Sequence, residues 1–307
     1  MITRDFLDDL RSLGPVRLME PLCRHTTWGV GGPADVYFLA RSEEELVRAF
    51  VIAHQHRVPV FVLGSGSNVL VGDAGIRGLV IGNQVAGIEG PQPEDGWLRV
   101  RALSGTSLAT AARRLAFAGV GGLEWACGIP GTVGGAVVYN AGAYGGCLRD
   151  VLVSARLADA QGRVLEMGPQ ELALGYRGSV LTRGLLQELV VLSVDLHLWE
   201  GDPQVLKRRV RELDARRKAA QPPGRNAGSV FKNLPDRPAW WLIDQVGLRG
   251  YRIGDAQVSE KHANFILNLG KARAADIRAL IELARQRVRE RFGVELELEV
   301  TLVGEGF

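Results

Sequence analysis

The stretch GIPGTVGGAVVYNAGAYGG (residues 128–146) places seven glycines in nineteen positions, with β-branched residues and one proline between them. An ordered glycine loses more backbone entropy than any other residue, so this density would weaken an ordinary structural segment. It indicates that something approaches this backbone so closely that side chains are excluded. Pro130 and Gly131 predict a turn, and Thr132 stands where it can N-cap a short helix over 133–136. We expect free amides at that helix start to attract phosphate oxygens, and a side chain at Gly134 to clash with the ligand.

A second glycine-rich loop, VLGSGSNVLVGDAGIRG (residues 62–78), begins at the end of a strand candidate. Gly64 and Gly66 form a G-x-G pair, but Val69 takes the place of the third Rossmann glycine, and a strand rather than a helix follows. A P-loop is excluded because Gly-Lys-Ser/Thr is absent. Taken alone, this loop is equally well explained as a β-turn. Two glycine loops of different design, about 65 residues apart, can however bracket a long diphosphate ligand, which predicts a dinucleotide site of another kind.

Composition limits the class of protein. The chain has 307 residues, 46% of them apolar, which is enough for two domains or one large one. With 37 basic and 34 acidic residues, the net charge of +3 is too balanced for nucleic acid to be the main partner. Three cysteines without a CxxC spacing argue for a reducing compartment and against a zinc site. No signal peptide and no membrane span is recognisable, so we expect a cytoplasmic protein without membrane insertion.

The hydrophobic pattern indicates an α+β fold. The segments 34–40, 42–56 and 59–63 read as a strand, a helix and a strand, and Ser42 with Glu45 gives the helix a capping-box pattern. Short strands follow over 69–105, then a helix at 107–119 and strands of a mixed or antiparallel sheet.

The organisation changes near residue 198. A charged helix and a Pro-Gly breaker cluster come next, and then two further helices and a strand over 294–303. We therefore expect one domain over 1–197, with subdomains of about 1–78 and 79–197, and a second domain over 198–307.

The two glycine loops resemble the flavin domain of the UDP-N-acetylenolpyruvoylglucosamine reductase (MurB) family. Four later stretches agree with that family in order and spacing: GYRGSVL (175–181), NAGSVFKNL (226–234), VSEKHANFILN (258–268) and FGVELELEVTLVG (292–304). The resemblance runs from about residue 25 to 304. It implies an FAD-binding module of the vanillyl-alcohol-oxidase type, made of two α+β subdomains, in the first domain and a smaller α+β substrate-binding domain in the second. The short C-terminal part is similar to the second subtype, which lacks a tyrosine-bearing loop insertion, and FKNLP departs from the commoner FKNP.

The resemblance also implies a reaction. NADPH gives a hydride to non-covalently bound FAD, and UDP-N-acetylglucosamine enolpyruvate then enters the same cleft and is reduced to UDP-N-acetylmuramate for peptidoglycan synthesis. It likewise implies a monomer that serves cell wall biogenesis, cell shape and cell division. The cofactor-binding residues carried over are Leu63, Gly64, Ser65, Gly66, Ser67, Asn68, Val69, Gly128, Pro130, Gly131, Thr132, Gly134, Gly135, Ala136, Asn140, Ala141 and Gly142. The substrate-binding residues are Tyr176, Arg177, Lys232, Asn233, His262 and Asn264.

Three residues carry the implied chemistry. A guanidinium such as that of Arg177 can fork onto the substrate carboxylate, although from sequence alone an arginine in GYRGS more often closes a surface turn. Ser229 becomes the proton donor to carbon, where a lone serine is usually a cap or a solvated hydroxyl. In VELELEVTLV three glutamates share one strand face, and periodicity cannot choose among them. The family motif selects Glu299, directly before Val300, to assist carboxylate polarisation and proton delivery.

Two other functions fit part of the sequence. An oxidase of the same flavin superfamily would keep the glycine loops but would not need Arg177, Ser229 and Glu299. A non-catalytic nucleotide-binding regulator would lack turnover and a flavin that bleaches on reduction. No set of His, Asp or Cys has metal-ligand spacing, so we predict no metal.

Overall fold

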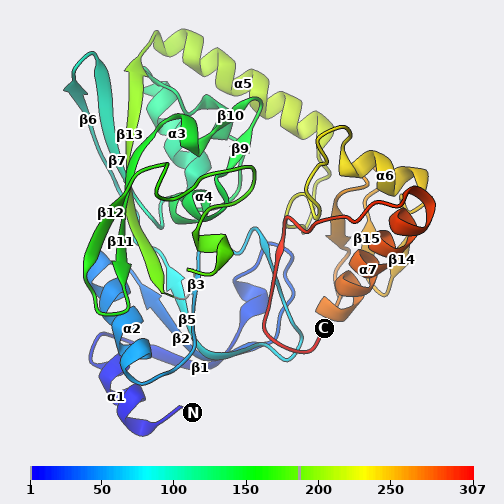
Figure 1. The fold of residues 1–307 in the computed structure, drawn as a ribbon, viewed down its shortest axis with the longest axis horizontal. Coiled ribbons are helices and arrows are strands. Elements are labelled where there is room, and N and C mark those ends of the chain that lie inside the picture. The colour runs from blue at the N-terminus through cyan, green and yellow to red at the C-terminus, as the bar shows by residue number, and fades with distance from the viewer. Residues whose placement is uncertain (1, 186–187) are drawn as a thin grey trace. The chain divides into compact units, whose positions relative to one another are not determined.

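The computed structural model describes residues 2–185 and 188–307, which form two compact units (Figure 1). The first unit comprises Met1–Arg17, Val36–Gly64 and Gly78–Arg217, and the second Leu18–Asp35, Ser65–Arg77 and Lys218–Phe307. The units are thus discontinuous in sequence, unlike the continuous ranges 1–197 and 198–307 expected above. The assignment of a cofactor domain and a substrate domain stays a prediction.

A six-stranded antiparallel sheet forms much of the first unit. Its order is β12-β11-β13-β7-β6, and β8 also pairs with β13. The strands are β6 (Ile88–Glu94), β7 (Trp97–Leu103), β8 (Val120–Gly121), β11 (Leu152–Asp159), β12 (Val164–Met167) and β13 (Leu189–Glu200). The helices in this part of the chain are α1 (Arg4–Arg11), α2 (Glu43–Gln55), α3 (Leu108–Phe117), α4 (Val133–Tyr139) and α5 (Pro203–Ala220). The antiparallel sheet and the helix predicted at 107–119 are confirmed.

A second sheet has the order β1-β2-β5-β3. Its strands are β1 (Val16–Pro21), β2 (Pro33–Ala40), β3 (Val60–Leu63) and β5 (Ile76–Asn83), and β3 runs parallel to β5. The predicted strand, helix and strand are therefore confirmed as β2, α2 and β3. Ser42 caps α2 by accepting the Glu45 amide at 3.1 Å, while the Glu45 carboxylate accepts the amide of Arg41 rather than that of Ser42.

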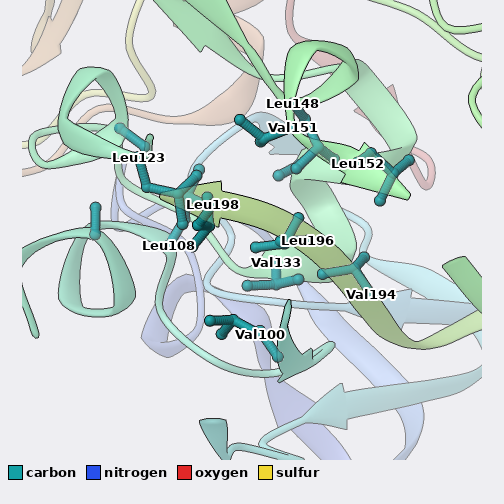
Figure 2. Packing of buried hydrophobic residues seen from close by; sticks show 14 of the residues in the cluster. Val100, Leu108, Leu123, Val133, Leu148, Val151, Leu152, Val194, Leu196 and Leu198 are labelled. Atoms are coloured by element: carbon teal, nitrogen blue, oxygen red, sulfur yellow. The ribbon is translucent and has the colours of Figure 1, made fainter. Parts of the chain in front are cut away.

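The helix α4 is fixed on the antiparallel sheet by the core of the first unit. Figure 2 shows Val133 of α4 beside Val194 and Leu196 of β13, with Val100 of β7 close by, and all four side chains are buried. Because this core is close-packed, the glycine-rich segment that leads into α4 stands on a rigid base.

An ion-paired cluster joins two central strands of the same sheet. Asp195 of β13, with a side chain only 2% exposed, accepts hydrogen bonds at 2.8 Å from Arg99 and Arg101 of β7. Burial acts against its ionisation, but the two guanidinium groups outweigh burial and hold the pKa of Asp195 below its usual value.

The second unit is built on a separate apolar core. It contains α6 (Ala239–Gln245), α7 (Ala274–Phe292) and a sheet of β14 (Arg252–Ile253), β15 (Ala256–Val258) and β16 (Ile266–Asn268). The buried indole of Trp28 donates to the Ile266 carbonyl at 2.7 Å, and Asn268 donates to the Trp28 carbonyl at 2.8 Å. These bonds attach the 18–35 segment to the C-terminal residues of the same unit.

The last predicted strand is shorter than expected. Only β17 (Thr301–Val303) is a strand, and it pairs in parallel with β4 (Val69–Val71), which follows the first glycine loop. Upstream, Leu298 makes a single bridge with Phe231. The alternation persists nevertheless, since Leu296 and Val300 are buried. A hairpin of β9 (Gly142–Ala143) and β10 (Gly146–Cys147) ends the second glycine stretch, and short 3-10 helices lie at Leu22–Arg24, Glu124–Ala126, Leu148–Asp150 and Leu181–Arg183.

Candidate active site

The two glycine loops meet inside the first unit. Gly64 directly follows the strand β3, and a Cβ built there would lie 2.7 Å from the hydroxyl oxygen of Thr132. That separation is far shorter than a van der Waals contact, so the close approach requires glycine at this position. The two glycine loops therefore touch at this point, and their bracketing of a diphosphate ligand stays a prediction.

Thr132 caps α4 as its spacing predicted. Its hydroxyl accepts the Gly135 amide at 3.3 Å. The two amides before it are also used, since Val133 donates to the Thr106 carbonyl at 2.9 Å and Gly134 to the Ser104 carbonyl at 2.8 Å. The expectation of free amides at this helix start is therefore wrong, because neighbouring backbone and the cap already satisfy them.

Most glycines of the 128–146 stretch are explained by the protein itself. A Cβ at Gly128 would lie 2.5 Å from Cδ of Arg217, and one at Gly134 would lie 3.1 Å from the Ser104 side chain. Gly131, with φ of +131°, has a backbone that side chains disfavour, and a Cβ at Gly142 would press on the facing strand β10. A side chain at Gly134 would thus press on Ser104 whether or not a ligand is bound, and the clash with the ligand stays a prediction.

Gly135 is the exception. A Cβ there would have no described neighbour closer than 3.6 Å, its φ is not in the left-handed region, and the residue is half-buried. No contact of the described protein requires glycine at this place, although alanine would favour the helix by about 1 kcal/mol. This is the feature that fits a flat cofactor lying against the start of α4.

The rest of the first glycine loop belongs to the second unit. Gly66 has φ of +63°, and a Cβ there would collide with the His25 carbonyl oxygen, so its own chain requires this glycine. Asn68 uses its side chain to donate to the Glu299 carbonyl at 3.0 Å, and its own carbonyl accepts the Thr301 amide at 3.0 Å. Asn68, expected to bind cofactor, therefore also fixes the segment that carries Glu299.

Ser229 and Glu299 lie on paired segments of the second unit. The Glu299 amide donates to the Val230 carbonyl at 2.8 Å, one residue after Ser229. The Lys232 amide donates to the Glu297 carbonyl at 2.9 Å, and the two side chains form an ion pair at 3.3 Å. The Glu297 side chain is 76% exposed, whereas Glu299 is half-buried, so the structure distinguishes two glutamates that periodicity could not.

Three predicted substrate-binding residues have partners within the second unit. Asn264 is 2% exposed, accepts the Phe231 amide and donates to the Phe231 carbonyl, so its side chain orients this segment, and its role toward a substrate stays a prediction. Asn233 accepts the Ala239 amide at 3.1 Å. The His262 ring packs edge-on against Phe265 at 4.8 Å, and burial lowers the pKa of its imidazole.

Arg177 occupies a tight turn of the first unit. Gly175 and Gly178 form a bridge across the turn, and the Gly175 amide donates to the Gly178 carbonyl at 3.0 Å. Arg177 has φ of 54°, a left-handed conformation that costs a non-glycine residue of order 1 kcal/mol. Its guanidinium lies 5.5 Å from the ring centre of Tyr176, which is 60% exposed. The surface turn considered from sequence is real, but its backbone is strained, as is common at functional sites.

Within residues 2–185 and 188–307, no group of three or more His, Cys, Asp or Glu is arranged to hold a metal ion. Over the same residues, no helix has both the length and the apolar character needed to span a bilayer.

The fold and the glycine loops define an FAD-binding protein: residues 34–168 match the family model described as FAD binding domain. Residues 219–303 match the C-terminal domain of UDP-N-acetylenolpyruvoylglucosamine reductase. The reductase from Rubrobacter xylanophilus is 46% identical over 93% of this chain and 94% of its own, and that from Lachnoclostridium phytofermentans is 41% identical over 97% and 96%. The crystal structure of the Thermus caldophilus enzyme is 39% identical with a TM-score of 0.75, and the match covers 94% of this chain and 98% of that one. The chain belongs to the UDP-N-acetylenolpyruvoylglucosamine reductase family.

Proposed function

We propose that this protein reduces UDP-N-acetylglucosamine enolpyruvate to UDP-N-acetylmuramate, with FAD as the bound cofactor and NADPH as the source of hydride. The observation that carries the proposal is the pairing of the Ser229 and Glu299 segments, which places a hydroxyl and a carboxylate on neighbouring backbone. Family membership supports the same reaction. The expected α+β fold and the FAD requirement agree with it.

FAD, when bound, supplies hydride transfer from the nicotinamide to the double bond of the enolpyruvyl group. Gly135 and the residues beside it would hold it, because a side chain is absent there and the space beside it is open to a ring or a diphosphate. The reaction adds one hydride and one proton across the double bond, so the protein must manage developing negative charge and deliver a proton.

The side chains of this chain divide that work. Arg177 binds the substrate carboxylate with its permanently cationic fork and stabilises charge that builds on the adjacent carbon. Glu299 polarises the same carboxylate. Ser229 donates the proton to that carbon, a step for which a positioned general acid contributes about 10²–10⁴-fold. Lys232 binds the diphosphate, and Asn233 binds the sugar or the carboxylate. To bind the substrate, Lys232 gives up its ion pair with Glu297.

The finer features follow from the same proposal. The product enters peptidoglycan precursor synthesis, so the activity serves cell wall biogenesis, cell shape and cell division. We place the protein in the cytoplasm, in agreement with its three free cysteines, and expect a monomer. FAD is bound non-covalently, and NADPH and the UDP-sugar use the site alternately.

Purified protein provides the test. It should be yellow, release FAD rather than FMN on denaturation, and oxidise NADPH only when the UDP-sugar enolpyruvate is present. A colourless protein that does not take up FAD, or a flavin that is reoxidised quickly by oxygen and not by the UDP-sugar, would overturn the proposal.

A further inference from the structure

Asn140 has a side chain whose amide nitrogen and amide oxygen each have a backbone partner within the first unit. It caps the C-terminal end of α4 with φ of 42°, and only 5% of it is exposed. Its amide nitrogen donates to the Gly175 carbonyl at 2.9 Å, and its amide oxygen accepts the Arg149 amide at 3.0 Å. These partners fix which end of the amide points where, because one is an acceptor and the other a donor.

We propose that Asn140 is a positioning residue for Arg177 and not a contact of the flavin. Its bond to Gly175 holds the first residue of the turn 175–178, two residues before Arg177. The inference rests on the proposed function of Arg177 as the group that binds the substrate carboxylate.

The turn needs such a support. Gly175 and Tyr176 are exposed, and the left-handed backbone of Arg177 persists only if the surroundings over-determine it. The other side of the turn is held by the fully buried Ser179, whose hydroxyl donates to the Val138 carbonyl at 2.7 Å. Both supports therefore reach the last turn of α4.

The same helix begins at the cofactor loops. Thr132, its N-cap, is the residue that Gly64 approaches, and α4 spans seven residues, about 10 Å, from there to Asn140. One helix packed on the sheet thus sets the place of the Arg177 turn relative to the loops expected to hold the flavin. Displacing the turn should therefore impair only the half-reaction that uses Arg177.

Two substitutions separate the role of the side chain from that of the backbone. Asn140→Gly keeps the left-handed backbone and removes both side-chain bonds, whereas Asn140→Asp keeps an acceptor for the Arg149 amide and loses the donor to Gly175. In both variants, rapid-mixing absorbance should show flavin reduction by NADPH at the normal rate. Reoxidation by the UDP-sugar enolpyruvate should slow by roughly 10–100-fold, the penalty of a misplaced catalytic group.

Asp159→Ala serves as a matched control for lost stability. It removes a buried side chain that caps the turn between β11 and β12 by accepting the Gln161 and Arg163 amides at 2.9 Å. It should lower the melting temperature and leave both half-reactions unchanged. In an Arg177→Lys background, Asn140→Gly should add little further slowing, because residues that act through one another are not additive.

A second readout does not depend on the activity. Amide hydrogen exchange of the cofactor-free protein should quicken at 175–181 in Asn140→Gly and stay unchanged at 133–139. If exchange is faster in Asn140→Gly but the wild type shows no reoxidation by the UDP-sugar, the proposed function is refuted, while the support of the turn by Asn140 stands. Loss of FAD, equal slowing of both half-reactions, or unchanged exchange at 175–181 would overturn the positioning role. If Asn140→Gly does not fold, Asn140→Asp and Ser179→Ala provide the same comparison.

Discussion

Adjacent glycines of α4 should respond to alanine with opposite signs. At Gly134 the new Cβ would lie 3.1 Å from the Ser104 Cβ and 3.2 Å from the Ser104 carbonyl oxygen, which already accepts the Gly134 amide. Overpacking of this kind costs about 1–3 kcal/mol, and we expect it to outweigh the gain of about 1 kcal/mol from helix propensity because one of the two crowded atoms is backbone. At Gly135 the nearest described atom is 3.6 Å away, so only the gain remains.

The substitution at Gly135 should stabilise the cofactor-free protein but weaken FAD binding. If the flavin lies against Gly135, the methyl group of Gly135→Ala occupies its space, and FAD affinity should fall at least about tenfold, or 1.4 kcal/mol. The cofactor-free Gly135→Ala protein should meanwhile melt about 1–2 °C above the wild type, and Gly134→Ala below it. Thermal unfolding of cofactor-free protein and an FAD titration by flavin fluorescence measure the two effects separately. A Gly135→Ala protein that is more stable and binds FAD as the wild type does would refute the assignment of Gly135 to the cofactor site.

Three further predictions concern single side chains. Asp195→Asn should cost about 1–3 kcal/mol at pH 7 in denaturant unfolding, below the range for fully buried pairs because the arginines are about a third exposed. Since the pKa of Asp195 is lowered in the folded state, its contribution to stability is present above the unfolded value of 3.8 and is lost as the pH falls through the folded pKa. An Asp195→Asn protein that unfolds in acid at the same pH as the wild type would contradict this. Glu299→Gln should slow flavin reoxidation by the UDP-sugar, while Glu297→Gln, on the exposed carboxylate, should be near neutral; the reverse order would show that the motif selects the wrong glutamate. Arg177→Lys keeps the charge but loses the fork, so it should lower kcat more than it raises KM, and an effect on KM alone would assign Arg177 to binding.

The local elements of the fold could be predicted from the sequence because their signals are short-range. Thr132 is three residues from the Gly135 amide that it caps, and the apolar positions of α2 recur at helical spacing. The last strand is shorter than its alternation predicts, because alternation reports which side of a chain is buried and not which partner pairs with it. Upstream of β17, Leu298 makes a single bridge to Phe231 and no continuous ladder, although buried and exposed residues still alternate there.

The committed asparagines could not be predicted in the same way. The partner of Asn140 lies 35 residues away and that of Asn68 lies 231 residues away, so nothing near either residue announces its role. The discontinuous units could not be predicted for the same reason. Each unit is made of three separate segments, and no change in composition marks where the chain leaves one unit and enters the other. Glu299 was selected by resemblance, and its half-buried position beside the exposed Glu297 gives a physical reason for that selection.

Ser229→Ala tests the proposed mechanism most directly, because Ser229 should serve only one of the two half-reactions. Anaerobic rapid mixing with NADPH should reduce the flavin of the variant at close to the wild-type rate, since no proton is needed at the substrate carbon. Reoxidation by the UDP-sugar enolpyruvate should then fall by about 10²–10⁴-fold, and Ser229→Cys should recover part of the loss because a thiol can also donate a proton. Equal slowing of both half-reactions would make Ser229 a structural residue, and unaltered reoxidation would contradict its role as the proton donor.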